Sequence, residues 1–281
     1  MYSQYYGKIL FMENINKFYQ ILTASYLRYI IISGGAFFLF YIWKKGYFHR
    51  FKIQKAFPKP KAISTEIKYS LLTTLIFSLV IYSFLFTELR SYTKLYENFG
   101  EHSIGYFIFS ILLIIFIHDT YFYWTHRLMH WKKIFPYIHH IHHKSHNPTP
   151  LAAFSFHPLE AIVEVGILPI ILFTIPVYKV ALIIFGLYMV LMNVMGHFGY
   201  ELFSKNFLNN PFTKWMNTST HHNMHHHYSK GNYGLYFNIW DSLMGTNHKN
   251  YAKYFNKAVE NRDTKLAIKN EMIQPEIGGS Y

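Results

Sequence analysis

The stretch 104–130 reads IGYFIFSILLIIFIHDTYFYWTHRLMH and joins an apolar run directly to a histidine pair. Its first part, IGYFIFSILLIIFI, has the composition of a membrane helix, and the chain becomes polar at His118 and Asp119. His126 and His130 follow at i,i+4 spacing, which places both imidazoles on one helix face. The stretch therefore predicts a membrane helix that ends in two side chains able to share a metal ion.

This apolar run is one of five in the chain. Each is short for a full span, which needs roughly 20 apolar residues, but flanking Tyr, Trp and Lys side chains can reach the membrane interface. Five such runs and a mean hydropathy of +0.07 argue against a large soluble helical core. The runs are Tyr29–Trp43, Leu71–Phe86, Ile104–Trp124, Ala161–Tyr178 and Val180–Met195.

The composition narrows the class of protein further. Of 281 residues, 51% are hydrophobic and 15% are charged, which excludes a disordered chain. The absence of cysteine excludes a disulfide scaffold, a thiolate zinc site and a self-contained iron–sulfur centre. The net charge of +13, in so apolar a chain, favours a membrane protein with basic cytosolic loops over a nucleic-acid-binding protein. The 18 histidines are the unusual feature, and 16 of them lie between His118 and His248.

The loop charges predict the orientation of the spans. The connection 87–103 has more acidic than basic residues, which suits the outer side of the membrane. After the third run the chain is basic again, and the last two runs, 161–196, form a hairpin that enters and leaves on that same side. This order places every histidine module and the C-terminal tail on the cytoplasmic face. The first connection, 44–61, is also predicted to be cytoplasmic because it has no acid and carries Lys44, Lys45, Arg50, Lys52, Lys55, Lys59 and Lys61.

We therefore expect an all-α integral membrane protein: a short bundle of three transmembrane helices and a re-entrant helical hairpin, under a cytosolic histidine-rich cap. The expected regions are an N-terminal transmembrane part (1–125), a catalytic part that includes the hairpin (126–250) and a polar tail (251–281). Residues 5–22 are expected to form an interfacial amphipathic helix, and the tail is expected to be a cap or disordered. No cleavable signal peptide is recognisable in the sequence.

The histidines occur in three modules. The first is the pair at positions 126 and 130, and the second, at 139–143, has the pattern H-x-x-H-H within HHIHH. The third, HHNMHHH at 221–227, repeats H-x-x-H-H from His222. Spacings of three and four residues converge on one helix face. Three such modules, two with identical spacing, indicate metal binding rather than surface polarity.

The ligand type limits the choice of metal. Imidazoles suit Zn, Cu, Fe and Ni, whereas the shortage of carboxylate and thiolate ligands argues against Mg, Ca and iron–sulfur clusters. Eight or more ligands exceed the needs of one ion, so two metals are expected. The Glu-x-x-His pattern of soluble di-iron bundles is absent. Three acids near the modules, Asp119, Glu160 and Asp241, can accept the second N–H of a ligand histidine and so fix its tautomer. For Asp119 the alternative is a membrane-interface residue that is hydrogen-bonded to Tyr123 at i+4.

Taken in order, these modules resemble the histidine boxes of the fatty acid hydroxylase/sterol desaturase superfamily of membrane non-haem di-iron oxidases. The similar segments run from about 118 to 246. Within the superfamily, the text at 142–160 is most similar to the C5 sterol desaturase branch. The matching segments are HDTYFYWTHRLMH at 118–130, HHIHH at 139–143, NPTPLAAFSFHPLE at 147–160, GHFGYE at 196–201, HHNMHH at 221–226 and NYGLYFNIWDSLMGT at 232–246.

The resemblance implies a set of metal ligands. His157 and His221 are additional candidates. Some hydroxylases of the superfamily have a further histidine four residues before the position of His197, where this chain has Asn193. Either a water molecule or Asn193 completes the coordination of that metal ion, or His157 takes the place of the missing histidine. The nine implied ligands are His126, His130, His139, His142, His143, His197, His222, His225 and His226.

The resemblance also implies the reaction. Two Fe ions would use O2 to hydroxylate or desaturate an unactivated C–H bond of a lipid, a sterol or a fatty acyl chain, that enters from the bilayer. Electrons would come from an external donor, cytochrome b5 or a ferredoxin with its reductase, since the chain has no cysteine for a cluster and no G-x-G-x-x-G motif. A basic face would suit an acidic electron carrier.

The alternative from another class is a divalent metal-ion transporter or a metal-binding membrane protein. A transporter predicts histidines and acids near the middle of several spans, whereas here the histidines follow the apolar runs. The compact length and short loops favour the bacterial inner membrane over the endoplasmic reticulum as the location.

Overall fold

The computed structural model describes residues 2–273, with side chains from 12 to 264. Within this part, four helices are long and apolar enough to cross a membrane. The protein is an all-α integral membrane protein, as predicted. The four helices are Met12–Trp43, Pro60–Phe86, Ile104–Met129 and Lys179–Gly196.

The first of these is longer than its apolar run. Helix α1 (Tyr2–Tyr29) continues without a break through a π-helical turn, α2 (Gly35–Phe37) and a second π-helical segment that ends at Trp43. The helix expected at 5–22 is present as part of this longer helix, because the chain between positions 8 and 33 contains no glycine or proline to end it. Its interfacial position stays a prediction. The side chains of residues 1–11 lie outside the described part.

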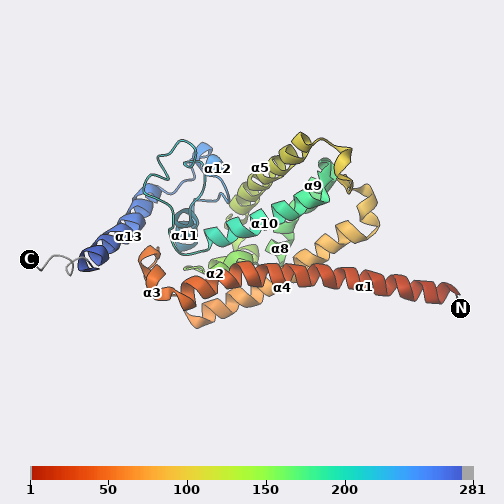
Figure 1. The fold of residues 1–281 in the computed structure, drawn as a ribbon, viewed down its shortest axis with the longest axis horizontal. Helices are drawn as coiled ribbons and strands as arrows, with labels where there is room; N and C mark the ends of the chain where they lie inside the picture. Colours follow the sequence, from red (N-terminus) through yellow and green to blue (C-terminus); the bar gives the residue numbers. More distant parts are fainter. Residues whose placement is uncertain (1, 274–281) are drawn as a thin grey trace, which may run out of the picture.

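The next elements return the chain along α1. Helix α3 (Lys45–Phe48) and a 3₁₀ turn lead to α4 (Pro60–Phe86), which begins with proline in its first turn. Helix α4 packs along α1 and against α8 (Pro158–Val165), and Figure 1 shows α1 and α4 side by side.

Helices α5 (Ile104–Met129) and α10 (Lys179–Gly196) carry the histidines toward one end of the bundle. A two-residue parallel pairing of β1 (Leu95–Tyr96) with β2 (Val177–Tyr178) lies shortly before both helices in the chain. The two helices thus start beside the same small sheet, contact each other, and run in the same direction. Their C-terminal ends both carry histidines, in the last turn of α5 and as the residue that follows α10.

The predicted hairpin is present, but its first arm is broken. Helix α8 ends before Gly166, and α9 (Ile167–Thr174) follows it. A Cβ atom at position 166 would lie 2.8 Å from the hydroxyl of Tyr121, so only glycine allows α5 to pack this closely. Helix α10 then runs back from α9 toward α11 (Ser219–Tyr228), as Figure 1 shows.

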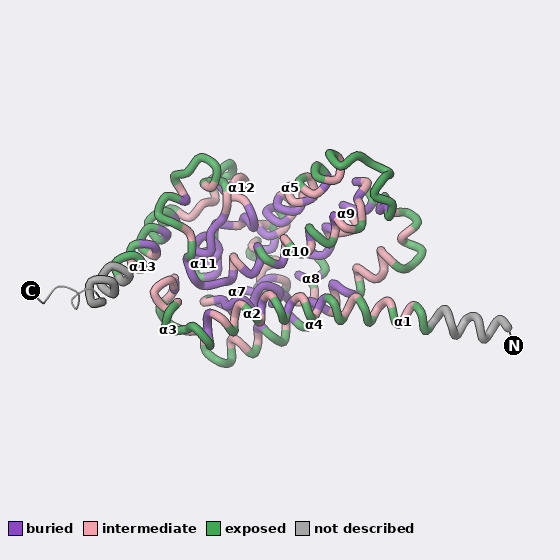
Figure 2. Tube along the Cα trace, viewed as in Figure 1, coloured by how far each residue is buried: buried purple, intermediate pink, exposed green. Residues whose placement is uncertain are grey.

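Short elements form the histidine-rich cap. They are α6 (Phe135–Ile138), α7 (His140–His143), α11 (Ser219–Tyr228) and α12 (Ile239–Leu243). Buried residues gather around α7 and α11 in Figure 2, although α11 is among the most polar helices of the chain.

The polar tail begins as an ordered helix, α13 (Tyr251–Ile273). Phe255 and Val259 are fully buried and pack with Met224 of α11, so this helix covers the third histidine module. Of the two alternatives for the tail, the structure shows a cap as far as Arg262, which donates to the carbonyls of Leu202 and Phe203. The helix itself continues to residue 273. Residues 274–281 lie outside the described part.

Candidate metal centre

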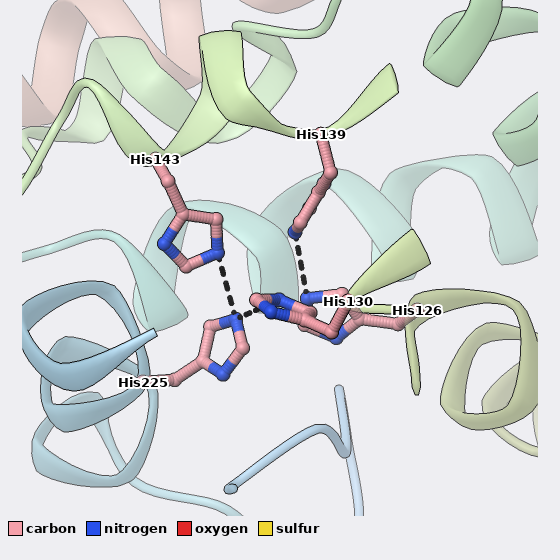
Figure 3. Close-up of side chains that lie close together, drawn as sticks. All are labelled: His126, His130, His139, His143 and His225. Atoms are coloured by element: carbon pink, nitrogen blue, oxygen red, sulfur yellow. Dashed lines mark hydrogen bonds between the residues drawn. The ribbon is translucent and has the colours of Figure 1, made fainter. Parts of the chain in front are cut away.

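Five of the histidines converge from three elements into one cluster, drawn in Figure 3. Their ligand-type nitrogens all lie within 4.8 Å of one another. The end of α5, the short helices after it and α11 supply them. We call this the five-histidine cluster; it consists of His126, His130, His139, His143 and His225.

The other four form a second group, the four-histidine cluster: His142, His197, His222 and His226. The two clusters are neighbours, since the rings of His143 and His226 stack with their centroids 4.9 Å apart. All nine histidines named from the sequence lie in the two clusters. His157 and His221 lie in neither.

The H-x-x-H-H modules divide between the clusters in a reciprocal way. In the second module, His139 and His143 enter the five-histidine cluster, while His142 enters the other. In the third module the i,i+4 pair enters the four-histidine cluster, and only His225 crosses to the first. The histidines of an H-x-x-H-H module were predicted to converge on one helix face, but the structure divides each of these modules between the two clusters. With about 100° of rotation per residue, positions i and i+4 lie about 40° apart and share a site, whereas position i+3 lies about 100° from i+4 and faces the adjacent site.

Hydrogen bonds at Nδ1 determine which nitrogen of each ring is free. His126 Nδ1 lies 2.8 Å from the carbonyl oxygen of Tyr233, which can only accept. His139 Nδ1 lies 2.6 Å from Oε1 of Glu160. His126 therefore holds its proton on Nδ1 in the neutral state, and His139 does so when Glu160 is ionised. Their Nε2 atoms face each other at 3.0 Å with two lone pairs and no proton between them, an arrangement that a cation would stabilise.

The same pattern occurs in the four-histidine cluster. His197 Nδ1 donates to the carbonyl of Asn193 at 2.8 Å, and His142 Nδ1 lies 3.3 Å from the carbonyl of Ser155. Their Nε2 atoms are 3.2 Å apart. Nitrogen ligands about 2.1 Å from a shared first-row metal, at right angles to one another, would be separated by about 3 Å. The nine histidines thus fit the ligand requirements of two such ions.

Burial keeps these imidazoles in the ligand form. Desolvation lowers the pKa of His197 to about 4, and desolvation with neighbouring imidazoles holds the pKa of His142, His222 and His226 well below 6.5. Neutral imidazole is the form that binds metal, so the folded protein presents the ligands without first having to release protons at neutral pH.

Comparison with known proteins agrees with this geometry. A family model described as fatty acid hydroxylase matches residues 111–246, which include both clusters. The chain belongs to the fatty acid hydroxylase superfamily. A rat lathosterol oxidase is 33% identical over 187 residues, and the match covers 66% of this chain and 60% of the rat protein. No solved structure matches the chain.

Fungal relatives extend the similarity. A Delta(7)-sterol 5(6)-desaturase of Gibberella zeae is 30% identical over 184 residues, which cover 66% of this chain and 55% of that protein. One of Schizosaccharomyces pombe is 26% identical over 267 residues and covers 92% of this chain and 86% of its own. The similarity lies with the sterol desaturase branch of the superfamily, and the chain spans about 60% of the lathosterol oxidases it matches. These relatives come from animals and fungi and do not support the expected bacterial location.

Of the three acids expected to support the ligands in this superfamily member, Glu160 does so directly. It lies in the first turn of α8, is fully buried, and accepts from His139. His157 precedes that helix and accepts a hydrogen bond from the backbone N–H of Leu159, so it caps α8. Asn193 takes part through its backbone carbonyl, because that oxygen accepts from His197.

Asp241 supports the five-histidine cluster indirectly, through a loop. Its carboxylate accepts backbone N–H bonds from Tyr233 at 2.9 Å and Gly234 at 2.7 Å, and so holds the loop whose carbonyl accepts from His126. His221 is fully buried behind the clusters, with Nε2 3.5 Å from Asp241 Oδ2.

Asp119 does not contact a histidine in the described part of the chain, contrary to expectation. It accepts backbone N–H bonds from Tyr236 at 2.7 Å and Phe237 at 3.2 Å. A carboxylate seven residues before His126 faces the loop after α11 rather than the metal centre. The loop carbonyls of Tyr233, Gly231 and Ser155, which lie near Nδ1 of His126, His225 and His142, were not predicted from the sequence. Tyr233 and Ser155 lie in the family-like segments 232–246 and 147–160, and Gly231 lies one residue outside the first of these.

A cavity of about 760 Å³ within the bundle extends toward the clusters, although none of their nine histidines is among its lining residues. Phe122, Phe156 and Asn193 line it. The ring of Phe122 lies 4.9 Å from that of His126, and the ring of Phe156 lies 5.1 Å from that of His142. The apolar cavity therefore ends beside both clusters.

Proposed function

We propose that the protein is a membrane-bound di-iron oxidase that uses O2 to hydroxylate or desaturate an unactivated C–H bond of a lipid, a sterol or a fatty acyl chain. The observation that carries this proposal is the pair of histidine clusters at the end of an apolar cavity, with unprotonated Nε2 atoms facing one another. Membership of the fatty acid hydroxylase superfamily and the names of the sterol-oxidising relatives support it.

The proposal assigns each cluster to one iron ion. Histidine suits iron as well as zinc, but zinc has no redox chemistry, and oxidation of an unactivated C–H bond requires a redox-active metal. When bound, the two ions would supply electron transfer to O2 and the oxidant for the C–H bond.

The chain's own residues prepare the site for that chemistry. Backbone carbonyls and Glu160 hold the rings of His126, His139, His142 and His197 with Nε2 directed inward. The phenyl rings at the cavity end, Phe122 and Phe156, exclude water and can orient an apolar substrate beside the clusters.

The electrons must come from another protein, because the chain has no cysteine for a cluster. We propose a cytochrome b5 or a ferredoxin with its reductase, docking on a cytoplasmic face that carries the histidine cap. The basic connection 44–61 would attract an acidic carrier to this face.

Metal analysis of the purified protein, together with lipid mass spectrometry of a heterologous host, tests the proposal. We expect two iron ions per chain, and lipids that gain one oxygen atom or lose two hydrogen atoms only when the gene is expressed. A host that expresses the His225→Ala variant is the control. Gradient-driven metal uptake into vesicles without any change in lipid composition would instead support the transporter.

A further inference from the structure

Arg28 lies at the middle of the first membrane-spanning helix. It is sixteen residues from one end of Met12–Trp43 and fifteen from the other. An arginine at the centre of a bilayer costs about 3 kcal/mol or more, and such residues usually mark a functional site with a partner.

No protein group among the described side chains, 12–264, forms a hydrogen bond or an ion pair with the Arg28 guanidinium. Its Nε atom is buried without an acceptor. The side chain lines the 760 Å³ cavity. Glu164, the acidic residue in the cavity lining, forms no ion pair with it. The charge therefore faces an otherwise largely apolar cavity without a counter-ion from the protein.

The helix opposite is shaped to admit the guanidinium. A Cβ atom at Gly186 of α10 would lie 3.0 Å from Nη1 of Arg28, so glycine at this position leaves room for the charged group against the helix. Gly186 also lines the cavity.

The distance from Arg28 to the clusters follows from the rise along two helices. Gly186 precedes His197 by eleven residues of α10 and its end, about 16 Å of helix rise. The neighbouring Phe185 contacts His118 of α5, with ring centroids 5.2 Å apart, and His126 follows eight residues later, about 12 Å. Arg28 is thus about 12–16 Å from the histidines along the cavity.

We propose that Arg28 binds the anionic head group, a carboxylate or a phosphate, of an amphiphilic lipid whose apolar chain extends along the cavity to the histidine clusters. The inference rests on the proposed function and specifies its substrate class. A guanidinium binds such anions through two parallel hydrogen bonds and compensates its own burial in doing so. The oxidised carbon is then remote from the head group. A neutral sterol would leave the Arg28 charge without a partner.

Equilibrium binding to the iron-loaded protein in micelles of an uncharged maltoside detergent tests this inference without requiring turnover. The probes are oleate, oleyl alcohol with the same chain but no charge, cholesterol as a neutral sterol, and inorganic phosphate as an anion without a chain. Arg28→Gln removes the charge, and Arg28→Lys keeps it without the planar fork. Lys17→Gln is the matched control, since Lys17 is on the same helix and pairs with Glu13 instead.

We expect wild type to bind oleate more tightly than oleyl alcohol or cholesterol, with phosphate failing to displace oleate. Arg28→Gln should weaken oleate binding by a factor on the order of ten or more, and Arg28→Lys by less, while oleyl alcohol binding stays unchanged. Lys17→Gln should bind like wild type. Displacement of oleate by phosphate, or preferential binding of cholesterol, would overturn the inference, as would unchanged oleate binding in Arg28→Gln.

A second variant covers the case in which Arg28 substitutions fail to fold. Gly186→Ala keeps the charge but crowds Nη1, and should weaken oleate binding selectively; equal oleate affinity would contradict the proposal. Iron content, measured in every sample, separates the two hypotheses. If the variants contain two iron ions and bind oleate like wild type, only the role of Arg28 is rejected. If wild type contains no iron, the proposed function is rejected.

Discussion

At His126 and His139, the hydrogen-bond acceptor at Nδ1 determines whether Nε2 has a free lone pair. A carbonyl and a carboxylate each take one N–H, so the two Nε2 lone pairs meet at 3.0 Å with no hydrogen to share. In a protein without metal this is an unfavourable contact. For these two residues the ligand role is therefore supported by hydrogen bonding as well as by spacing, and the assignment of all nine histidines can be tested one residue at a time.

Replacing His142 with alanine should abolish turnover and lower the bound metal from two ions toward one per chain. His142 is one of only four donors in its cluster, and its loss leaves three. His225→Ala should have the corresponding effect on the other cluster. His146→Ala and His248→Ala are the controls, because both residues lie outside the clusters; full activity and metal content in His142→Ala would refute the assignment.

Glu160→Gln should weaken metal binding by roughly 10- to 100-fold while the protein stays folded. The amide oxygen can still accept from His139, but the negative charge that makes the imidazole a stronger ligand is lost. Metal affinity measured by competition with a chelator checks this. Glu97→Gln, at an exposed position outside both clusters, should leave the affinity unchanged, and an equal affinity for the two variants would exclude a role for the carboxylate.

At the scale of elements, the centre depends on two helices that run in parallel and on loops that reach them. Helices α5 and α10 begin beside the β1–β2 pairing and bring His126 and His197 to the same end. The loop after α11 supplies acceptors to both His126 and His225, through the carbonyls of Tyr233 and Gly231. The position of this loop is therefore as important as that of the helices.

Gly234→Ala should displace that loop and cost about 2 kcal/mol of stability, with partial loss of metal. A Cβ atom there would lie 2.6 Å from the carbonyl oxygen of Phe237 and 3.0 Å from Asp241 Oδ2, and a backbone carbonyl cannot move aside cheaply. Thermal unfolding and metal content measure the effect. Gly100→Ala, where a Cβ would meet nothing within 4 Å, is the control. Equal unfolding temperatures would show that the loop is adaptable.

At the scale of the whole molecule, the orientation in the membrane remains a prediction from charge. The chain has no native cysteine, so single cysteines can be introduced without background. Lys59→Cys, in the basic connection, should react with a membrane-impermeant maleimide only from the cytoplasmic side. Tyr92→Cys, 74% exposed in the wild-type residue, should react only from the opposite side. Labelling of both variants from the same side would contradict the predicted topology.

Much of this protein could be predicted because the relevant signals are local. Apolar runs identify membrane helices through their length, and spacings of three and four residues identify helix faces. The eight ligand candidates that occur at these spacings all lie in the two clusters. The resemblance of the segments at 118–246 to a family placed His197, which has no partner at helical spacing in the sequence.

The sequence by itself determined the helical membrane class and the histidines that come together, since both follow from residues close in the chain. Only the tertiary structure decided how His142 and His143, or His225 and His226, divide between two sites, because that depends on how α7 and α11 face each other. It likewise decided the position of Arg28. In sequence, Arg28 borders an apolar run, and the unbroken helix from Tyr2 places it at the centre of the span, facing α10.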